Sequence, residues 1–146
     1  MLKRFLMVLL NAAALVLELL PFGMPLVLNG GAPDVVYKTE SSYWAPFWLI
    51  NISAHFTLIS TGILMVLVIL FAFISNKKRH GSLLIFSLVT AVISTLAMIY
   101  SITQWIDAYT LVSVGVTLVL WTEFIVIRDF MKKTYGDIVV SGYKDK

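Results

Sequence analysis

The stretch NAAALVLELLPFGMP, residues Asn11 to Pro25, decides the fold because it is an apolar, helix-length run with one carboxylate inside it. That carboxylate belongs to Glu18, and the run ends in a Pro-x-Gly-x-Pro break. Three more apolar runs follow it along the chain. A helix of about 20 residues crosses the ~30 Å hydrocarbon core of a bilayer. We therefore predict an all-α integral membrane protein, a single domain whose four transmembrane helices form an antiparallel bundle.

The predicted spans follow the uninterrupted apolar sequence. They cover about residues 5–28, 47–75, 83–103 and 108–127, with an outer loop at 29–46 and a cytoplasmic tail at 129–146. Short connections make the second, third and fourth spans antiparallel neighbours. The 146-residue chain is 60% hydrophobic and 13% charged, whereas soluble domains are about half apolar and about a quarter charged. The runs are too long and too uniformly apolar for the strands of a membrane barrel.

The basic residues predict the orientation. Of the eleven Lys and Arg residues, only Lys38 falls on the outer side of the predicted spans. The positive-inside rule then places both termini in the cytoplasm, and we expect the plasma (inner) membrane. A net charge of +3 can also indicate nucleic-acid binding, but these basic clusters lie beside apolar runs. We therefore expect the lipid bilayer, and not nucleic acid, as the partner.

A polar layer is predicted near the middle of the membrane. Intramembrane acidic residues usually face the bundle interior or a water-filled cavity. At about 1.5 Å per residue, Glu18 and His55 fall at similar depth, and Asn51 lies one turn from His55 on the same helical face. The same layer passes through Ser94 and Thr95 of the third span. These five residues are the predicted substrate or proton path. In the fourth span the layer passes through Gly115, with Ser113 and Thr117 beside it. Asn11, Thr61 and Thr90 extend it inward.

Each of these polar residues has a functional and a structural interpretation. Histidine has an unperturbed pKa of about 6.5, so His55 paired with Glu18 would pass a proton at physiological pH. Alternatively, Glu18 is a protonated carboxyl hydrogen-bonded to a neighbouring helix, and His55 donates to a backbone carbonyl. Glu123 lies near the predicted inner edge, where we expect it to act as an anchor that extends to the headgroups or pairs with Arg4, Arg128 or the Lys77–Arg79 cluster.

Small residues recur along the third span at steps of three and four. In lipid, such stripes let helix backbones approach closely. We therefore predict a helix-packing seam, to which Gly115 of the fourth span adds a matching small face. The seam consists of Ser87, Ala91, Ser94 and Ala97.

The sequence contains no Gly-rich phosphate loop, nucleophile elbow or HExxH motif, so ordinary hydrolase, kinase or metalloprotease chemistry has no residues to use. It contains no cysteine, and a zinc or haem site would need more ligands than His55 supplies; we expect no metal and no cofactor. The hypothesis is a proton-linked transporter or conduction subunit, assembled as a homodimer or larger complex. The alternatives are a non-catalytic membrane partner or scaffold subunit, and a lipid- or quinone-modifying enzyme.

The plan of four spans, small size and one acidic residue in the first span is similar to that of small multidrug-resistance transporters. The long outer loop, the double-proline break and His55 have no match in that family's pattern. No residue roles are therefore taken from it.

Overall fold

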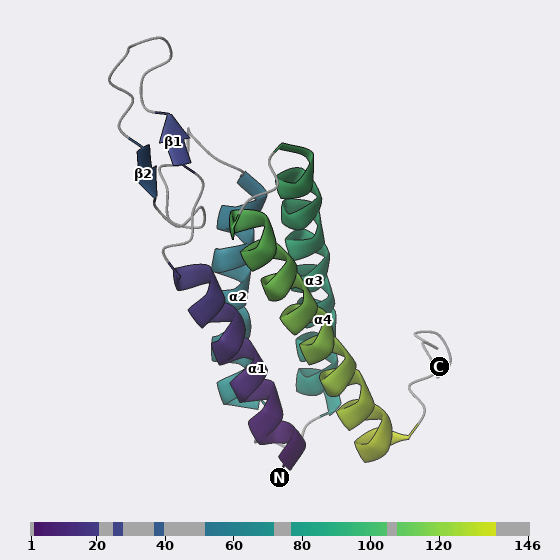
Figure 1. Cartoon of the computed structure of the whole chain (residues 1–146). Coiled ribbons are helices and arrows are strands. Elements are labelled where there is room, and N and C mark those ends of the chain that lie inside the picture. The colour runs from purple at the N-terminus through teal and green to yellow at the C-terminus, as the bar shows by residue number, and fades with distance from the viewer. Residues whose placement is uncertain are drawn as a thin grey trace.

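The computed structural model describes residues 2–20, 25–27, 37–39, 52–71, 77–104 and 108–136 (Figure 1). The described chain contains four helices, which confirms the predicted all-α class, and one short pair of antiparallel strands in which Leu26 lies opposite Lys38. The elements in chain order are α1 Leu2–Leu19, β1 Pro25–Val27, β2 Tyr37–Thr39, α2 Ile52–Phe71, α3 Lys77–Gln104 and α4 Ala108–Tyr135.

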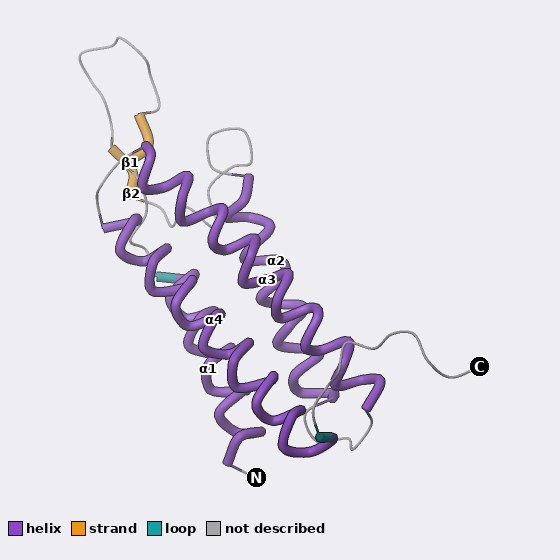
Figure 2. Tube along the Cα trace, turned by 90° about the vertical axis from the view of Figure 1, so that its right-hand side faces the viewer, coloured by secondary structure: helices purple, strands orange, loops and turns teal. Residues whose placement is uncertain are grey.

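The four helices lie side by side in a bundle (Figures 1 and 2). Each helix contacts two others, so that α1, α2, α3 and α4 follow one another around the bundle and α4 closes the ring against α1. Helices α1 and α4 run antiparallel, because Lys3 bonds to Asp129 while Asn11 bonds to Glu123. The strand pair lies beyond the C-terminal end of α1 (Figure 1).

Three of these helices are long and apolar enough to cross a membrane. The segments that satisfy both requirements are Ala54–Phe71 in α2, Lys78–Thr103 in α3 and Leu111–Tyr135 in α4. Their apolar side chains cover the outward faces of the helices as well as the interior, as expected for helices that are surrounded by lipid.

The helix boundaries differ from the predicted spans. Helix α1 ends at Leu19 rather than near residue 28, because Pro21 disfavours helical backbone at the residue before it, and residues 25–27 form β1 instead. Helix α3 begins at Lys77, inside the basic turn expected before residue 83, and α4 continues past residue 127 into the predicted tail. Most of the predicted outer loop at 29–46, and the tail from residue 137, lie outside the described residues.

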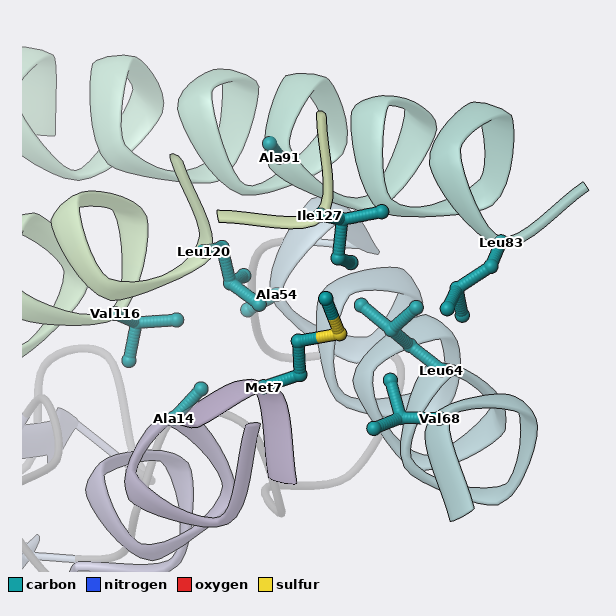
Figure 3. Packing of buried hydrophobic residues seen from close by; sticks show 10 residues of the cluster. All are labelled: Met7, Ala14, Ala54, Leu64, Val68, Leu83, Ala91, Val116, Leu120 and Ile127. Atoms are coloured by element: carbon teal, nitrogen blue, oxygen red, sulfur yellow. The ribbon is translucent and has the colours of Figure 1, made fainter. Parts of the chain in front are cut away.

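One apolar cluster takes side chains from all four helices (Figure 3). Its members are Met7, Ala14, Ala54, Leu64, Val68, Leu83, Ala91, Val116, Leu120 and Ile127. In α1 the buried residues are Met7, Asn11, Ala14 and Glu18, spaced by four, three and four, so they form one helical face. The face of α1 that packs the core therefore also carries its amide and its carboxylate.

Candidate functional site

Glu18 is buried between α1 and α2. Its side chain has 0% exposure, and Thr61, which is equally buried, places its hydroxyl oxygen 2.8 Å from Glu18 Oε1. Thr61 lies in the middle of α2 and meets Glu18 in the last turn of α1. The carboxyl group thus meets a neutral hydroxyl inside the bundle.

The Thr61 hydroxyl has a second oxygen within hydrogen-bond distance. Thr61 Oγ1 lies 2.8 Å from the Thr57 carbonyl oxygen as well as from the Glu18 carboxyl oxygen. A threonine hydroxyl has one hydrogen to donate and two lone pairs to accept with. The carbonyl oxygen can only accept, so the direction of the Glu18 contact depends on whether Glu18 itself carries a hydrogen.

A second buried carboxylate lies between α1 and α4. Asn11 Nδ2 donates a hydrogen bond of 3.1 Å to Glu123 Oε2, and both residues have 0% exposure. The other oxygen of each group, Asn11 Oδ1 and Glu123 Oε1, has no hydrogen-bond partner among the described residues. The expected anchoring role of Glu123 at the membrane edge is therefore wrong: its side chain points into the bundle because it shares a helical face with Leu120 and Ile127.

Helices α3 and α4 are joined by hydroxyl groups. Ser94 Oγ lies 2.8 Å from Thr117 Oγ1, and Thr117 Oγ1 donates to the Ser94 carbonyl oxygen at 3.1 Å. With its one hydrogen on that carbonyl, Thr117 accepts the Ser94 hydroxyl hydrogen, so this pair is fully satisfied. Thr95 accepts a 3.0 Å hydrogen bond from Trp121 Nε1.

Glu18 lies at about the same level of the bundle as this hydroxyl pair. Leu17, its neighbour in α1, approaches Gly115 of α4 at 3.6 Å from the position of an added Cβ atom. Gly115 precedes Thr117 by two residues, or about 3 Å along the helix. Glu18, Ser94 and Gly115 thus lie at about one level of the bundle, and the role of this level as a substrate or proton path stays a prediction.

The end of the bundle that holds the N-terminus is rich in basic and aromatic residues. His80 Nε2 lies 2.8 Å from the Phe71 carbonyl oxygen, and His80 Nδ1 lies 2.7 Å from the Tyr135 hydroxyl. Because a carbonyl only accepts, Nε2 carries the hydrogen, and in the neutral ring Nδ1 accepts from Tyr135. His80 therefore connects the last turn of α2 to the last turn of α4.

Arg4 lies over the Phe130 ring at 5.5 Å, and Arg79 over the Phe71 ring at 5.8 Å. Lys3 pairs with Asp129, whose hydrogen bond raises the pKa of the Lys3 ammonium. These contacts hold basic groups from α1 and α3 against the same end of the bundle.

The hydrogen-bond partner that the structure describes for Glu18 is Thr61. His55 is half-buried and precedes Thr61 by six residues, which is about 9 Å along α2. The predicted contact between Glu18 and His55 stays a prediction, and Asn51 lies outside the described residues. Among the packing residues, Ser87, Ala91, Ser94 and Ala97 are all buried.

The residues that sequence reasoning undervalued are Asn11, Thr61 and Glu123. Asn11 and Glu18 are seven residues apart and so share one face of α1, a spacing that was visible in the sequence. Glu123 differs from the apolar core positions Leu120 and Ile127 by three and four residues, which gives the same signal.

Within the described ranges, no three His, Asp or Glu side chains gather in a group that would hold a metal ion. Comparison of the chain with known protein families, with characterised proteins and with solved structures gives no match.

Proposed function

We propose that this protein is a small proton-linked transporter or conduction subunit in which Glu18 is the group that carries the proton. In this proposal α1 is a fourth transmembrane helix, both termini lie in the cytoplasm, and the membrane is the plasma (inner) membrane. Thr61 is the first hydrogen-bond partner of the carboxyl group, and His55 and Asn51 are the residues that the sequence predicts on its outer side. Four helices enclose little volume, so the path is completed by a homodimer or larger assembly.

The observation that carries the proposal is the pair of 2.8 Å contacts made by the Thr61 hydroxyl oxygen. If Glu18 is ionised, its oxygen and the Thr57 carbonyl compete for one hydrogen. If Glu18 carries a proton, it donates to Thr61 Oγ1 while Thr61 donates to Thr57, and both contacts become full hydrogen bonds. The geometry thus favours a protonated Glu18 carboxyl group that donates a hydrogen bond to the Thr61 hydroxyl oxygen. A carboxyl group that holds a proton inside the bundle is what a proton carrier needs.

The outward face of α1 supports its place in the membrane. Phe5, Leu9 and Val16 have exposures of 63%, 52% and 58%, so more than half of each apolar side chain faces away from the bundle. Full burial of such a side chain is worth about 1.5–3 kcal/mol, so the exposed half of each would cost roughly 1 kcal/mol if it were left in water. Lipid around α1, as around its neighbours α2 and α4, removes this cost.

Basic groups at one end of the bundle support the orientation. Lys3, Arg4 and Arg79 lie at the end that holds the N-terminus and the last turn of α4, and such residues concentrate on the cytoplasmic side. Because the chain has no cysteine, single-cysteine variants need no background substitutions. Lys132→Cys should react with a membrane-impermeant thiol reagent in inverted vesicles only, and Lys38→Cys in right-side-out vesicles only.

Flux through Glu18→Gln proteoliposomes tests the function. The wild-type protein should show flux of protons, or of a solute driven by a pH gradient, and Glu18→Gln should abolish it because the amide cannot carry the proton. The matched control is Glu40→Gln, which removes the same charge from the predicted outer loop and should leave the flux unchanged. Undiminished flux through Glu18→Gln would show that the carboxyl group is not the carrier.

One observation favours a second candidate, a scaffold or partner subunit. The Ser94–Thr117 pair is fully satisfied and joins α3 to α4 without offering a group that titrates. If Glu18 and Thr61 act in the same way, their contact only fixes the packing of α1. Under this alternative Glu18→Gln changes the stability, the wild-type protein carries no flux, and a larger membrane protein co-purifies with it.

A further inference from the structure

The Asn11–Glu123 pair contains two buried oxygen atoms that need a hydrogen and lack one. Asn11 Nδ2 donates to Glu123 Oε2 at 3.1 Å, and both side chains have 0% exposure. Asn11 Oδ1 and Glu123 Oε1 remain without a hydrogen-bond partner within the described part of the chain. Buried polar atoms are normally hydrogen-bonded, so two such atoms in one pair require an explanation.

The donors and acceptors of the two side chains explain why these oxygens lack a partner. An amide oxygen only accepts hydrogen bonds, and so do both oxygens of an ionised carboxylate. Two acceptors in one pair therefore cannot satisfy each other. A protonated carboxyl group is different, because it adds one O–H donor and keeps an acceptor on its other oxygen.

We propose that Glu123 holds a proton on Oε1 and donates it to Asn11 Oδ1, so that the acid and the amide form a closed ring of two hydrogen bonds. Asn11 Nδ2–H already supplies the first bond, to Glu123 Oε2. The added hydrogen satisfies both remaining oxygens at once. Glu123 and Asn11 are then a proton-holding site between α1 and α4, separate from Glu18. The inference does not rest on the proposed function, because the ring would exist in a scaffold as well.

The charges around the pair agree with a neutral acid. The basic residues nearest in α1, Lys3 and Arg4, lie at least seven residues from Asn11, or about 10 Å along the helix, and contact Asp129 and Phe130 instead. In α4 the nearest basic residue, Arg128, is exposed and lies five residues from Glu123, which is about 7.5 Å along the helix and about 140° around it. The pair and Glu18 are separated by a similar distance, because Asn11 and Glu18 are seven residues apart. In the functional proposal, a proton would thus have two holding sites at different depths of one bundle.

Infrared spectroscopy of the lipid-reconstituted full chain tests the inference. The glutamates of the chain are Glu18, Glu40 and Glu123, so glutamate labelled with ¹³C at the side-chain carboxyl gives only their bands. In a Glu18→Gln background at neutral pH, we expect a labelled C=O stretch of a protonated acid. Glu123→Gln should remove it, and Glu40→Gln should not. Asn11→Leu should shift it to higher frequency, because the ring of hydrogen bonds is lost.

Two results would overturn the inference. The first is that Glu123→Gln removes intensity from the ionised carboxylate stretch instead, which would mean that a water molecule or a cation satisfies the two oxygens. The second is that Glu123→Gln fails to fold. Glutamine has nearly the same shape, and its amide can donate to Asn11 Oδ1 and accept from Asn11 Nδ2, so a neutral site should tolerate it with an unchanged unfolding midpoint.

Discussion

Thr61→Val measures whether the carboxyl group of Glu18 is neutral. The substitution replaces the hydroxyl with a methyl group of similar size, so the packing at a residue with 0% exposure is nearly preserved. It removes the 2.8 Å contact with Glu18 Oε1 and the 2.8 Å contact with the Thr57 carbonyl. The Thr57 carbonyl oxygen still takes part in the backbone hydrogen bonding of α2 after the substitution. The loss of the Glu18 contact is therefore the larger part of the change in stability.

The size of the loss depends on the charge of Glu18. Hydrogen bonds between transmembrane helices contribute about 0.6 kcal/mol on average and at most about 1.7 kcal/mol. Removing one partner of a buried charge costs about 3–5 kcal/mol, because the charge is left without compensation. Since the hydrogen-bond geometry favours a protonated Glu18, we expect Thr61→Val to lower the free energy of unfolding by about 0.5–2 kcal/mol.

Reversible unfolding in mixed detergent micelles, followed by circular dichroism, provides the measurement. The matched control is Thr122→Val on the outward face of α4, where the exposed hydroxyl donates only to the Leu118 carbonyl of its own helix at 2.8 Å. We expect the control to change the free energy of unfolding by less than about 0.5 kcal/mol. A loss above about 3 kcal/mol for Thr61→Val would refute the neutral carboxyl, and a loss equal to that of the control would refute the contact itself.

Three further predictions concern packing. A double-mutant cycle of Ser94→Ala and Thr117→Val should give a coupling energy of about 0.6–1.7 kcal/mol in the same unfolding assay. Gly115→Ala should be tolerated, because an added Cβ would lie at an ordinary contact distance of 3.6 Å from Leu17, whereas Gly115→Leu should lower the stability by about 1–3 kcal/mol through overpacking. His80→Phe should lower the stability by about 1–3 kcal/mol, because it removes both hydrogen bonds that join the ends of α2 and α4; no loss would show that these bonds contribute nothing.

The helices themselves could be predicted from the sequence because a membrane span leaves a strong signal. Uninterrupted apolar sequence of about 20 residues has few other structural solutions. The inward position of Glu18 followed from the cost of exposing a carboxyl group to lipid. The burial of Ser87, Ala91, Ser94 and Ala97 in α3 followed from their spacing along one face.

The register between helices could not be predicted in the same way. Counting depth from Phe5 and Phe47 assumed that both residues mark a membrane edge, but α1 begins at Leu2 and α2 at Ile52. The partner that the structure describes for Glu18 is Thr61, six residues after His55 in α2, and depth counting alone cannot say which residues of one face meet across an interface. Glu123 was misplaced because depth alone was used, whereas its helical face decides whether it points to the core.

The polar contacts of α1 determine how this helix is rotated about its own axis. In the proposed membrane placement of α1 there is no water-driven attraction between helices, so packing and hydrogen bonds determine the rotation. Lys3, Asn11 and Glu18 bond to partners on α4 and α2 from one side of α1, while Phe5 and Leu9 face outward. A rotation by one residue, about 100°, would break these contacts; with α1 in the membrane, as proposed, a carboxyl group turned toward lipid would cost about 3 kcal/mol. A stability measurement therefore responds to Glu18 and Asn11 whether they carry protons or only fix the helix. The two roles differ in where a hydrogen atom resides, and only a measurement of protonation or flux distinguishes them.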